Sequence, residues 1–364
     1  MPIVTSGLSR REALRVLGAA AASAALPACA PSVSHATPDD IVLYSSVDGE
    51  IIRPLLDAWH ARPGNGERVR LLGDTEATKT TGLMRRVLDE RPAPRADVWW
   101  SNELLATVRL AREGALQSFT CAGAERDAEW AGGGWPGAFR ARDATWYAFA
   151  CRARAIVSSS SRLRETERPR VLGDLAAPRL RGRVGLARPA FGTTRAQMAL
   201  LLSVHGEGPF TRWLESLARN GTRLYDGNSA VVRAVSRGEL DAALTDTDDA
   251  LAGIRNGWKV ALGVPRHELP GSPARAGELL IPNSVGLVRG GPNPAGGRAF
   301  LAFVLSGEVE RRLAADASAH RPIRPSLAGS FAGFAAPDPV AVDPSALADA
   351  ADRAVRLCER VLGG

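Results

Sequence analysis

Short apolar runs alternate with longer amphipathic stretches along most of the chain, starting at residue 41. The short runs fit buried strands, and the longer stretches carry apolar residues at helical spacing. Such alternation favours a parallel sheet with helices on both faces, which is an α/β fold. The first series is predicted as strand 41–44, helix 49–61, strand 68–73, helix 80–90, strand 96–100 and helix 102–113.

A second alternating series lies between two long strand patterns, at 146–158 and 278–287. The chain is therefore expected to leave a first lobe, build a second and return. We predict a two-lobed α/β protein with two parallel-type sheets, flanking helices, hinge crossovers and a ligand cleft between the lobes. The expected parts are lobe 1 at 41–145 plus 265–340, lobe 2 at 146–264, and a C-terminal helix at 341–364.

The elements of the second series are also predicted from the same alternation. They are strand 183–186, helices 193–205 and 209–220, strand 222–225, helix 229–237, strand 240–245, helix 248–256 and further helices within 294–313.

Residues 1–28 have the pattern of an export signal of twin-arginine type, with a basic head and an apolar stretch too short to span a bilayer. The stretch ends in Leu26-Pro27-Ala28-Cys29, which resembles a lipobox and predicts lipidation of Cys29. Ser34-His35-Ala36 is the alternative, a plain cleavage site. Residues 29–40 fit a flexible tether. The protein is thus expected in the periplasm or on the outer face of the cell envelope, anchored by lipid.

The formal charge of +7 comes from arginines interleaved with acidic residues, without a block of like charges or aromatic ladders. This distribution does not fit nucleic-acid binding. Beyond the leader no apolar run approaches a membrane span, so membrane contact is expected only through the lipid. Cys121, Cys151 and Cys358 are too few and too scattered for a disulfide framework or a zinc site, although one bridge stays open.

Gly192-Thr193-Thr194 follows the predicted strand 183–186 and begins a helix. Backbone N–H groups, two hydroxyls and the positive end of the helix dipole come together there, which is typical of an anion seat. The alternative is a plain threonine N-cap.

Asp246, Asp248 and Asp249 lie together at a predicted strand-to-helix junction. Asp248 alone would serve as a helix cap, but three carboxylates exceed what a cap requires. Glu76 lies on the loop after strand 68–73, where it is expected to line the cleft. Trp99 and Trp100 end a core strand, and we expect one to pack inside and the other to form the floor of the ligand site.

A series of segments in fixed order resembles the type 2 periplasmic solute-binding proteins of ABC importers, in the branch that contains the ferric-ion-binding proteins. The resemblance covers about residues 41–330. It implies a monomeric, non-enzymatic receptor that closes on its solute and passes it to a membrane permease and ATPase. The segments are IVLYSSVDGE, GDTEATKTTGLMRRVLDE, PRADVWWSNELLATVRLAREGAL, WYAFACRARAIVSS, ARPAFGTTRAQMALL, YDGNSAVVRAVSRGELDAALTDTDDA and IPNSVGLVRGGPNPAGGRAFLAFVLSGEV.

The resemblance also implies roles for single residues. Relatives bind their synergistic anion at the loop matching Gly192-Thr193-Thr194 and at an asparagine matching Asn228, and Arg154 matches an arginine that holds the anion in some members. Asp48 stands where relatives have their first histidine, and Asn102-Glu103 falls where they offer a carboxylate. The paired tyrosines that bind iron in relatives are replaced here by Asp248 and Asp249 or their neighbours.

The chain has only three tyrosines, none at the paired-tyrosine position, so a phenolate-dominated ferric site cannot be assembled. Hard oxygen ligands suit iron in a hydrated complex, Ca²⁺, Mg²⁺ or Mn²⁺, together with an anion. No resident cofactor is expected. The candidate metal ligands are Asp48, Glu103, Asp246 and Asp248. The candidate solute-binding residues are Asp48, Glu76, Asn102, Glu103, Arg154, Gly192, Thr193, Thr194, Asn228, Asp246 and Asp248.

The predicted function is capture of ferric iron or a small anionic solute for an ABC importer. A receptor for a phosphonate or a sugar phosphate is the first alternative. A secreted hydrolase would use Asp48, Glu76 and Asp246 as acid and base. The sequence lacks the Gly-x-Ser-x-Gly and His-Glu-x-x-His patterns that would support a hydrolase. A sensory lipoprotein of the same fold is the third alternative.

Overall fold

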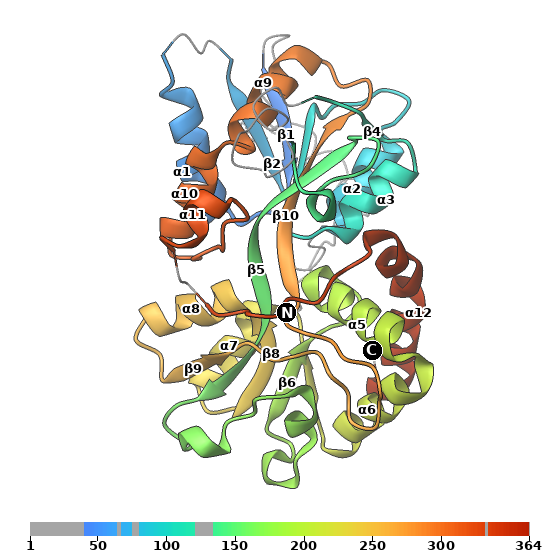
Figure 1. The fold of residues 1–364 in the computed structure, drawn as a ribbon, viewed down its shortest axis with the longest axis vertical. Helices are drawn as coiled ribbons and strands as arrows, with labels where there is room; N and C mark the ends of the chain where they lie inside the picture. Colours follow the sequence, from blue (N-terminus) through green and yellow to red (C-terminus); the bar gives the residue numbers. More distant parts are fainter. Residues whose placement is uncertain (1–39, 64–66, 75–79, 121–133, 332–333, 364) are drawn as a thin grey trace, which may run out of the picture. The chain divides into compact units, whose positions relative to one another are not determined.

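The computed structural model describes residues 40–63, 67–74, 80–120, 134–331 and 334–363 (Figure 1). The predicted signal peptide, Cys29, nearly all of the predicted tether, Glu76 and Cys121 lie outside the described residues. Within the described ranges, none of the helices has the length and hydropathy that a membrane crossing requires.

The described strands form one sheet of ten strands in the order β2-β1-β3-β10-β5-β8-β6-β7, with β4 paired to β10 and β9 paired to β5. The pairs β1–β2, β1–β3, β6–β7 and β6–β8 are parallel, whereas β10 and β5 run antiparallel to their neighbours. The strands are β1 Ile41–Ser45, β2 Val69–Gly73, β3 Val98–Ser101, β4 Leu116–Gln117, β5 Trp146–Ser159, β6 Val184–Ala187, β7 Arg223–Tyr225, β8 Ala242–Asp246, β9 Val260–Gly263 and β10 Leu280–Val288.

The prediction of two separate parallel-type sheets was wrong, because β5 belongs to both halves of the sheet. Its first part pairs with β10, from Trp146 opposite Gly286 to Ala153 opposite Leu280. Its second part, from Arg154 onward, pairs with β8 and β9. The hydrogen-bond ladder is therefore continuous from β2 to β7. All 14 residues of β5 are buried, which explains why this strand reads as an unbroken run of mostly apolar and small residues.

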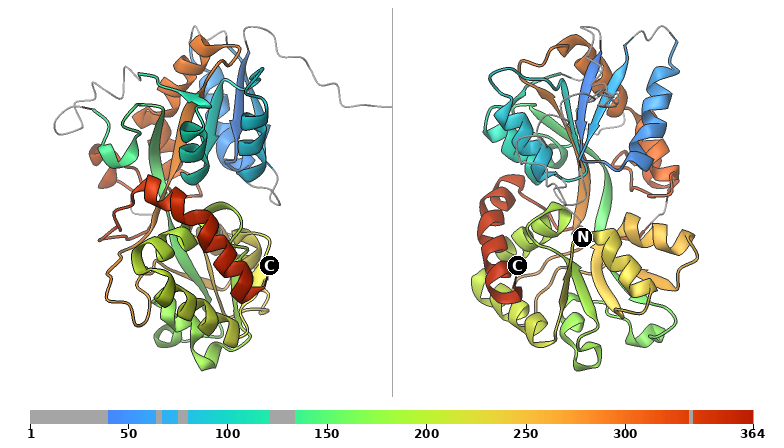
Figure 2. Two further views of the ribbon diagram at one scale, coloured as in Figure 1. Left: turned by 90° about the vertical axis from the view of Figure 1, so that its right-hand side faces the viewer. Right: turned by 180° about the vertical axis from the view of Figure 1, so that it is seen from behind.

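Helices cover both faces of each half of the sheet (Figures 1 and 2). Beside β1, β3 and β10, one face packs against α1, α9 and α10, and the other packs against α2 and α3. Beside β6 and β8, one face packs against α5, α6 and α12, and the other against α7. The helices are α1 Gly49–His60, α2 Thr81–Asp89, α3 Leu105–Arg112, α5 Gly192–His205, α6 Glu207–Arg219, α7 Asn228–Ser236, α8 Thr247–Arg255, α9 Pro294–Val304, α10 Gly307–Ala315, α11 Pro325–Ala328 and α12 Pro344–Leu362.

Trp99 and Trp100 are both fully buried, on opposite faces of β3. Successive strand residues point to opposite sides of a sheet, so one ring enters each core. The indole N–H of Trp99 donates to Thr107 Oγ1 at 2.7 Å, and that of Trp100 donates to Asn283 Oδ1 at 3.3 Å. The expectation that one of the two forms the floor of a ligand site was therefore wrong.

β5 and β10 are both irregular at the same level. Ala150 has a left-handed φ of 41°, and the β10 register shifts between Pro282 and Asn283. Asn283 Nδ2 donates to the Ala150 carbonyl at 2.8 Å, which joins the two irregular positions. A bulge of this kind bends the strands locally. The bend lies at Ala150, before the pairing of β5 passes from β10 at Ala153 to β8 at Arg154.

The predicted C-terminal helix is present as α12, which contacts α3, α5 and α6. Leu347 and Ala351 of α12 pack with Leu105 of α3 and Leu200 of α5 in one apolar cluster. Ion pairs join Arg112 of α3 to Asp349 at 2.6 Å and Arg195 of α5 to Asp352. The last helix therefore holds together two elements that belong to different halves of the sheet.

Cys151 and Cys358 are buried free thiols. Burial raises the pKa of the Cys358 thiol to about 12, and it raises that of Cys151 as well. Thiols with such pKa values stay protonated and unreactive at neutral pH.

Candidate functional site

A small pocket of about 50 Å³ lies at the carboxyl ends of β1, β3, β6, β7 and β8. Ligands of open α/β sheets collect at such strand ends. The pocket is lined by Asp48, Asn102, Arg152, Ala187, Arg188, Phe191, Gly192, Thr193, Thr194, Asp226, Gly227, Asn228, Ser229, Asp246 and Asp249.

The N-termini of α1, α5, α7 and α8 all reach this pocket, because their N-cap or first-turn residues line it. None of the four receives a hydrogen bond from its N-cap side chain. In contrast, α9, α10 and α12 are capped by Asn293, Ser306 and Asp343. α2 and α6 also lack such a bond, so its absence alone is no signature. Four N-termini directed at one pocket give it a positive backbone potential.

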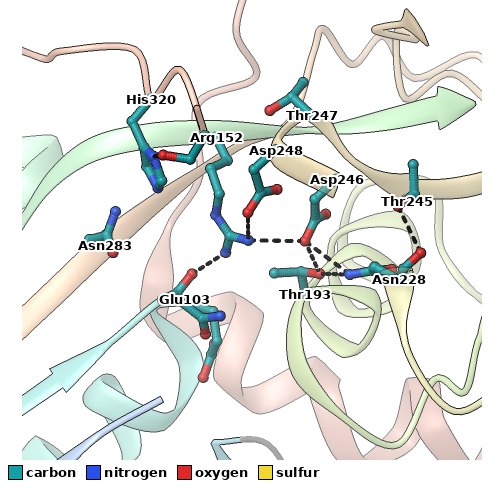
Figure 3. Close-up of polar contacts among 12 residues, drawn as sticks. Glu103, Arg152, Thr193, Asn228, Thr245, Asp246, Thr247, Asp248, Asn283 and His320 are labelled. Atoms are coloured by element: carbon teal, nitrogen blue, oxygen red, sulfur yellow. Dashed lines mark hydrogen bonds and ion pairs between the residues drawn. The ribbon is translucent and has the colours of Figure 1, made fainter. Parts of the chain in front are cut away.

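Arg152 of β5 lies at the centre of the buried polar groups beside the pocket (Figure 3). Its Nη1 is 3.0 Å from Asp248 Oδ2 and 3.3 Å from Asp246 Oδ2. Its Nη2 donates to the backbone carbonyl of Asn102, which follows β3. One guanidinium therefore connects carboxylates beside β8 with the backbone beside β3.

Asp246 accepts hydrogen bonds from four side chains. Besides Arg152, Arg154 Nη1 donates to its Oδ1 at 2.6 Å. Thr193 Oγ1 and Asn228 Nδ2 donate to its Oδ2 at 2.7 and 2.9 Å (Figure 3). Asp246 is the last residue of β8 and the N-cap of α8, so the end of the strand fixes this carboxylate at the pocket wall.

The electrostatics of the cluster are set by burial and by close opposite charges. Burial raises the pKa of Asp248, the charge of Arg152 opposes this rise, and the neighbouring Asp246 adds to it. For Arg152, burial favours the neutral form, but Asp248 and Asp246 outweigh it and raise the pKa. Arg152 therefore stays positively charged although it is buried. Asp246 forms ion pairs with both Arg152 and Arg154.

The structure brings most of the predicted solute-binding residues to the pocket. The ones that line it are Asp48, Asn102, Gly192, Thr193, Thr194, Asn228 and Asp246. Arg154 is fully buried and lies behind Asp246, away from the lining, and Asp248 lies behind Arg152 in the same way.

Glu103 does not line the pocket. Its carboxylate accepts hydrogen bonds from the backbone N–H groups of Leu105 at 2.5 Å and Ala106 at 3.0 Å, at the start of α3. Burial raises the pKa of Glu103, while these two donors oppose the rise. Its oxygens thus accept hydrogen bonds from backbone N–H groups that have no partner within the helix.

Both capping alternatives from the sequence were wrong. The N-cap of α8 is Asp246 rather than Asp248, which lies inside the first turn. The N-cap of α5 is Phe191, so Thr193 and Thr194 are already helical. Thr193 instead uses its hydroxyl on Asp246.

Sequence reasoning missed Arg152, although a signal was present. Arg152 and Arg154 are two apart in one strand, so both point to the same face, and a basic pair on the face of a buried strand needs acidic partners. Arg188 and Asp226 were also missed. They form a 3.3 Å ion pair at the pocket rim, with side chains 41% and 87% exposed.

Residues 41–316 match the family model described as bacterial extracellular solute-binding protein. The chain belongs to this family. The family consists of binding proteins rather than enzymes, so the expectation of a non-enzymatic protein is confirmed and the hydrolase alternative is wrong.

The chain is 27% identical over 314 residues to the major ferric iron-binding protein of Neisseria meningitidis serogroup A, covering 85% of this chain and 87% of the relative. It is 26% identical over 240 residues to the Fe(3+)-binding periplasmic protein of Serratia marcescens, covering 64% of this chain and 65% of the relative. These matches support the expected family branch of ferric iron-binding protein-like homologues.

Solved structures match with high coverage at low identity. Iron-bound HitA from Pseudomonas aeruginosa has a TM-score of 0.71 at 23% identity, covering 88% of this chain and 99% of that one. AfuA from Actinobacillus pleuropneumoniae, with fructose-6-phosphate bound, has a TM-score of 0.72 at 15% identity, covering 89% and 98%. The chain therefore has the α/β fold of periplasmic binding proteins.

Proposed function

We propose that this protein is the solute receptor of an ABC importer and that it captures a small anionic solute in the pocket beside Arg152. The carrying observation is that the N-termini of four helices reach one pocket that also contains an arginine. Oriented N–H groups and a guanidinium are the donors that phosphate, phosphonate and carboxylate groups prefer.

The two halves of the sheet act as the two lobes of the receptor, 41–145 plus 265–340 and 146–264, and β5 and β10 act as the hinge strands. Two observations support this division. The pocket takes Asp48 and Asn102 from one half and the Gly192, Asn228 and Asp246 region from the other. β5 and β10 are irregular at the same level, at Ala150 and at Pro282–Asn283, close to where the pairing of β5 changes.

The acidic groups at the pocket restrict which anions fit. Asp48, Asp249 and Asp246 face the same space as the helix N-termini. A zwitterion or a polyhydroxylated anion fits both the helix N-termini and the carboxylates. Its anionic group accepts from the N–H groups, and its ammonium or hydroxyl groups donate to the carboxylates. An aminophosphonate and a sugar phosphate are two classes with this composition.

A ferric complex that carries its own anion is the second candidate. The relatives named as ferric iron-binding proteins favour it, as do the carboxylates of Asp246, Asp248 and Asp249, which offer oxygens within 4.8 Å of one another. The tyrosines do not contribute. Tyr44 donates to Glu90 at 2.8 Å, Tyr147 donates to the Phe119 carbonyl at 3.3 Å, and Tyr225 is partly buried against the core cluster that contains α7.

The proposal also includes lipidation at Cys29, the envelope location, the monomeric state and delivery of the solute to a permease and ATPase. They are supported by the leader pattern and by the family. Mass spectrometry of the N-terminal peptide from native membranes tests the first point. A lipid-modified peptide that begins at Cys29 is expected, and a free amine after Ala36 would favour plain cleavage.

Thermal shift and calorimetry with a solute panel test the function. The panel contains inorganic phosphate, carbonate, a sugar phosphate, an aminophosphonate, ferric citrate and Mn²⁺. A ligand at 100 times its Kd stabilises the fold by about 2.7 kcal/mol, which is readily measured. We expect one of the anions to stabilise the protein without being chemically changed. A panel without any stabilising anion, or turnover of the phosphate ester, would contradict the proposal.

A further inference from the structure

The guanidinium of Arg152 is surrounded by oxygen atoms in the way that a bound cation is. Asp248 Oδ2 is 3.0 Å away, Asp246 Oδ2 is 3.3 Å away, and the Asn102 carbonyl accepts from Nη2. Figure 3 shows the Asp246 and Asp248 carboxylates beside the guanidinium of Arg152. Two carboxylates and a backbone carbonyl would otherwise be a set of hard oxygen ligands.

The same carboxylates are close enough to share one ion. Asp246, Asp248 and Asp249 each offer an oxygen within 4.8 Å of the others. Asp248 is 9% exposed, and its Oδ1 has no hydrogen-bond partner among the described residues. Since buried carboxylate oxygens are almost always paired, the orphan oxygen indicates an acidic group that its own protein leaves short of donors.

Arg152 is itself incompletely bound. Its Nε is buried and has no partner within the described part of the chain, so Arg152 is held only through its terminal nitrogens. A rigid structural arginine normally uses its whole planar fork. The contacts of Arg152 are instead concentrated on the carboxylates and on Asn102, which places its charge at the pocket wall.

We propose that Arg152 determines the specificity of this pocket, because its guanidinium takes the place of a cation between Asp246 and Asp248 and so excludes a free metal ion while favouring an anion. The inference deepens the proposed function and rests on its anionic form. A metal ion entering the cluster would be repelled by the fixed positive charge of Arg152. Because the cluster is buried, water screens this repulsion only weakly. An anion in the pocket meets the same charge with favourable sign.

The direct test is Arg152→Met, which keeps the length of the side chain and removes its charge. The probe is Tb³⁺ alone, a trivalent ion that prefers oxygen ligands, titrated by calorimetry. We expect the variant to bind Tb³⁺ at one saturable site, with an affinity at least about tenfold tighter than any binding by wild type. The double variant Arg152→Met with Asp248→Asn is expected to lose the gain, because it lacks one carboxylate of the set.

Two matched variants separate position from net charge. Arg188→Met removes the same charge from the pocket rim, and Arg152→Lys keeps a cation at the central position. Neither is expected to gain a Tb³⁺ site. A gain in Arg188→Met equal to that in Arg152→Met, or no gain in Arg152→Met, would overturn the inference.

Asp248→Asn with Arg152 retained provides a measurement that does not require the loss of the arginine. It leaves Arg152 with more uncompensated charge, so the affinity for inorganic phosphate is expected to rise by about tenfold. An unchanged or weaker affinity contradicts the inference, and it decides the question if Arg152→Met does not fold.

The two proposals fail in different ways. If no anion of the panel stabilises wild type, the proposed function fails, and the Tb³⁺ titrations still decide the role of Arg152. If wild type binds phosphate but Arg152→Met gains no metal ion, only the role of Arg152 fails.

Discussion

The Asp246 carboxylate lies 2.6 Å from the Arg154 guanidinium, and their side chains are 2% and 0% exposed. Both charges have lost their hydration, so each depends on the other. Asp246 also accepts hydrogen bonds from Thr193 and Asn228, and Arg154 Nε donates to Gln197 at 3.0 Å. The pair therefore anchors the wall of the pocket to the core of α5.

Replacing Asp246 by Asn should be strongly destabilising, because it leaves two buried arginines short of negative charge. We expect a loss of about 3–5 kcal/mol in the free energy of unfolding, measured by urea denaturation. The matched control is Asp226→Asn, which breaks the exposed pair with Arg188 and should cost less than about 1 kcal/mol. Equal urea midpoints for the two variants would show that the buried pair has no special weight.

Thr194 is the pocket hydroxyl whose removal should affect binding more than folding. It lines the pocket in the first turn of α5. Thr194→Val should weaken anion binding by about five- to tenfold, the value of one hydrogen bond, with little change in melting temperature. Thr211→Val, the same change on α6, is the control, and its affinity should equal that of wild type. If the two variants bind the anion equally well, the assignment of Gly192-Thr193-Thr194 as the anion seat is wrong.

Gly192 begins α5 with a left-handed φ of 54°, and a Cβ there would meet no atom within 4 Å. Conformation rather than space therefore requires glycine, and Gly192→Ala should destabilise the protein by about 1–2 kcal/mol in chemical denaturation. It should also weaken anion binding, because the N–H groups of the first turn are reoriented. Gly208→Ala, in the first turn of α6, has an ordinary φ and should be neutral or slightly stabilising.

Acid should destabilise the protein through His267, whose pKa burial lowers to about 3. The unfolded histidine has a pKa of about 6.5, so the folded state binds fewer protons below that pH. Stability is thus fully present above pH ~6.5 and is lost as the pH falls toward ~3, by about 1.4 kcal/mol per pH unit.

His267→Asn should remove this contribution and make the dependence of unfolding free energy on pH shallower between pH 6 and 4. His320, which has a pKa lowered to about 3 by burial and by Arg152, should give a separate and additive contribution. A wild-type slope in His267→Asn would mean that the imidazole is not held neutral by the fold.

The elements of the fold could be predicted from the sequence because apolar spacing is a local property. β1, α1, β6 and α12 all lie within three residues of their predicted bounds. β4 and β9 were missed since both are short and owe their strand character to pairing with β10 and β5. Pairing also made the sheet continuous, and nothing local in β5 shows its partners.

The pocket was predictable to the extent that strand ends and helix starts carry polar residues. Gly192-Thr193-Thr194, Asn228 and Asp246 lie together for this reason. The pairing of Asp246 and Asp248 with Arg152 and Arg154 was not predictable, because it depends on distances across the sheet. The position of Glu103 was not predictable either, because its carboxylate binds the start of its own helix rather than lining the pocket.

Helix α12 follows the family match, which ends at residue 316, yet it rests on elements inside that match. Any motion that parts α3 from α5 must break the Arg112–Asp349 or Arg195–Asp352 pair, or wet Leu347 and Ala351. Exposing one leucine costs roughly 1.5–3 kcal/mol. Helix α12 thus adds its own resistance to the separation of α3 from α5. Under the proposed function, release of the solute would depend on these residues, which do not line the pocket.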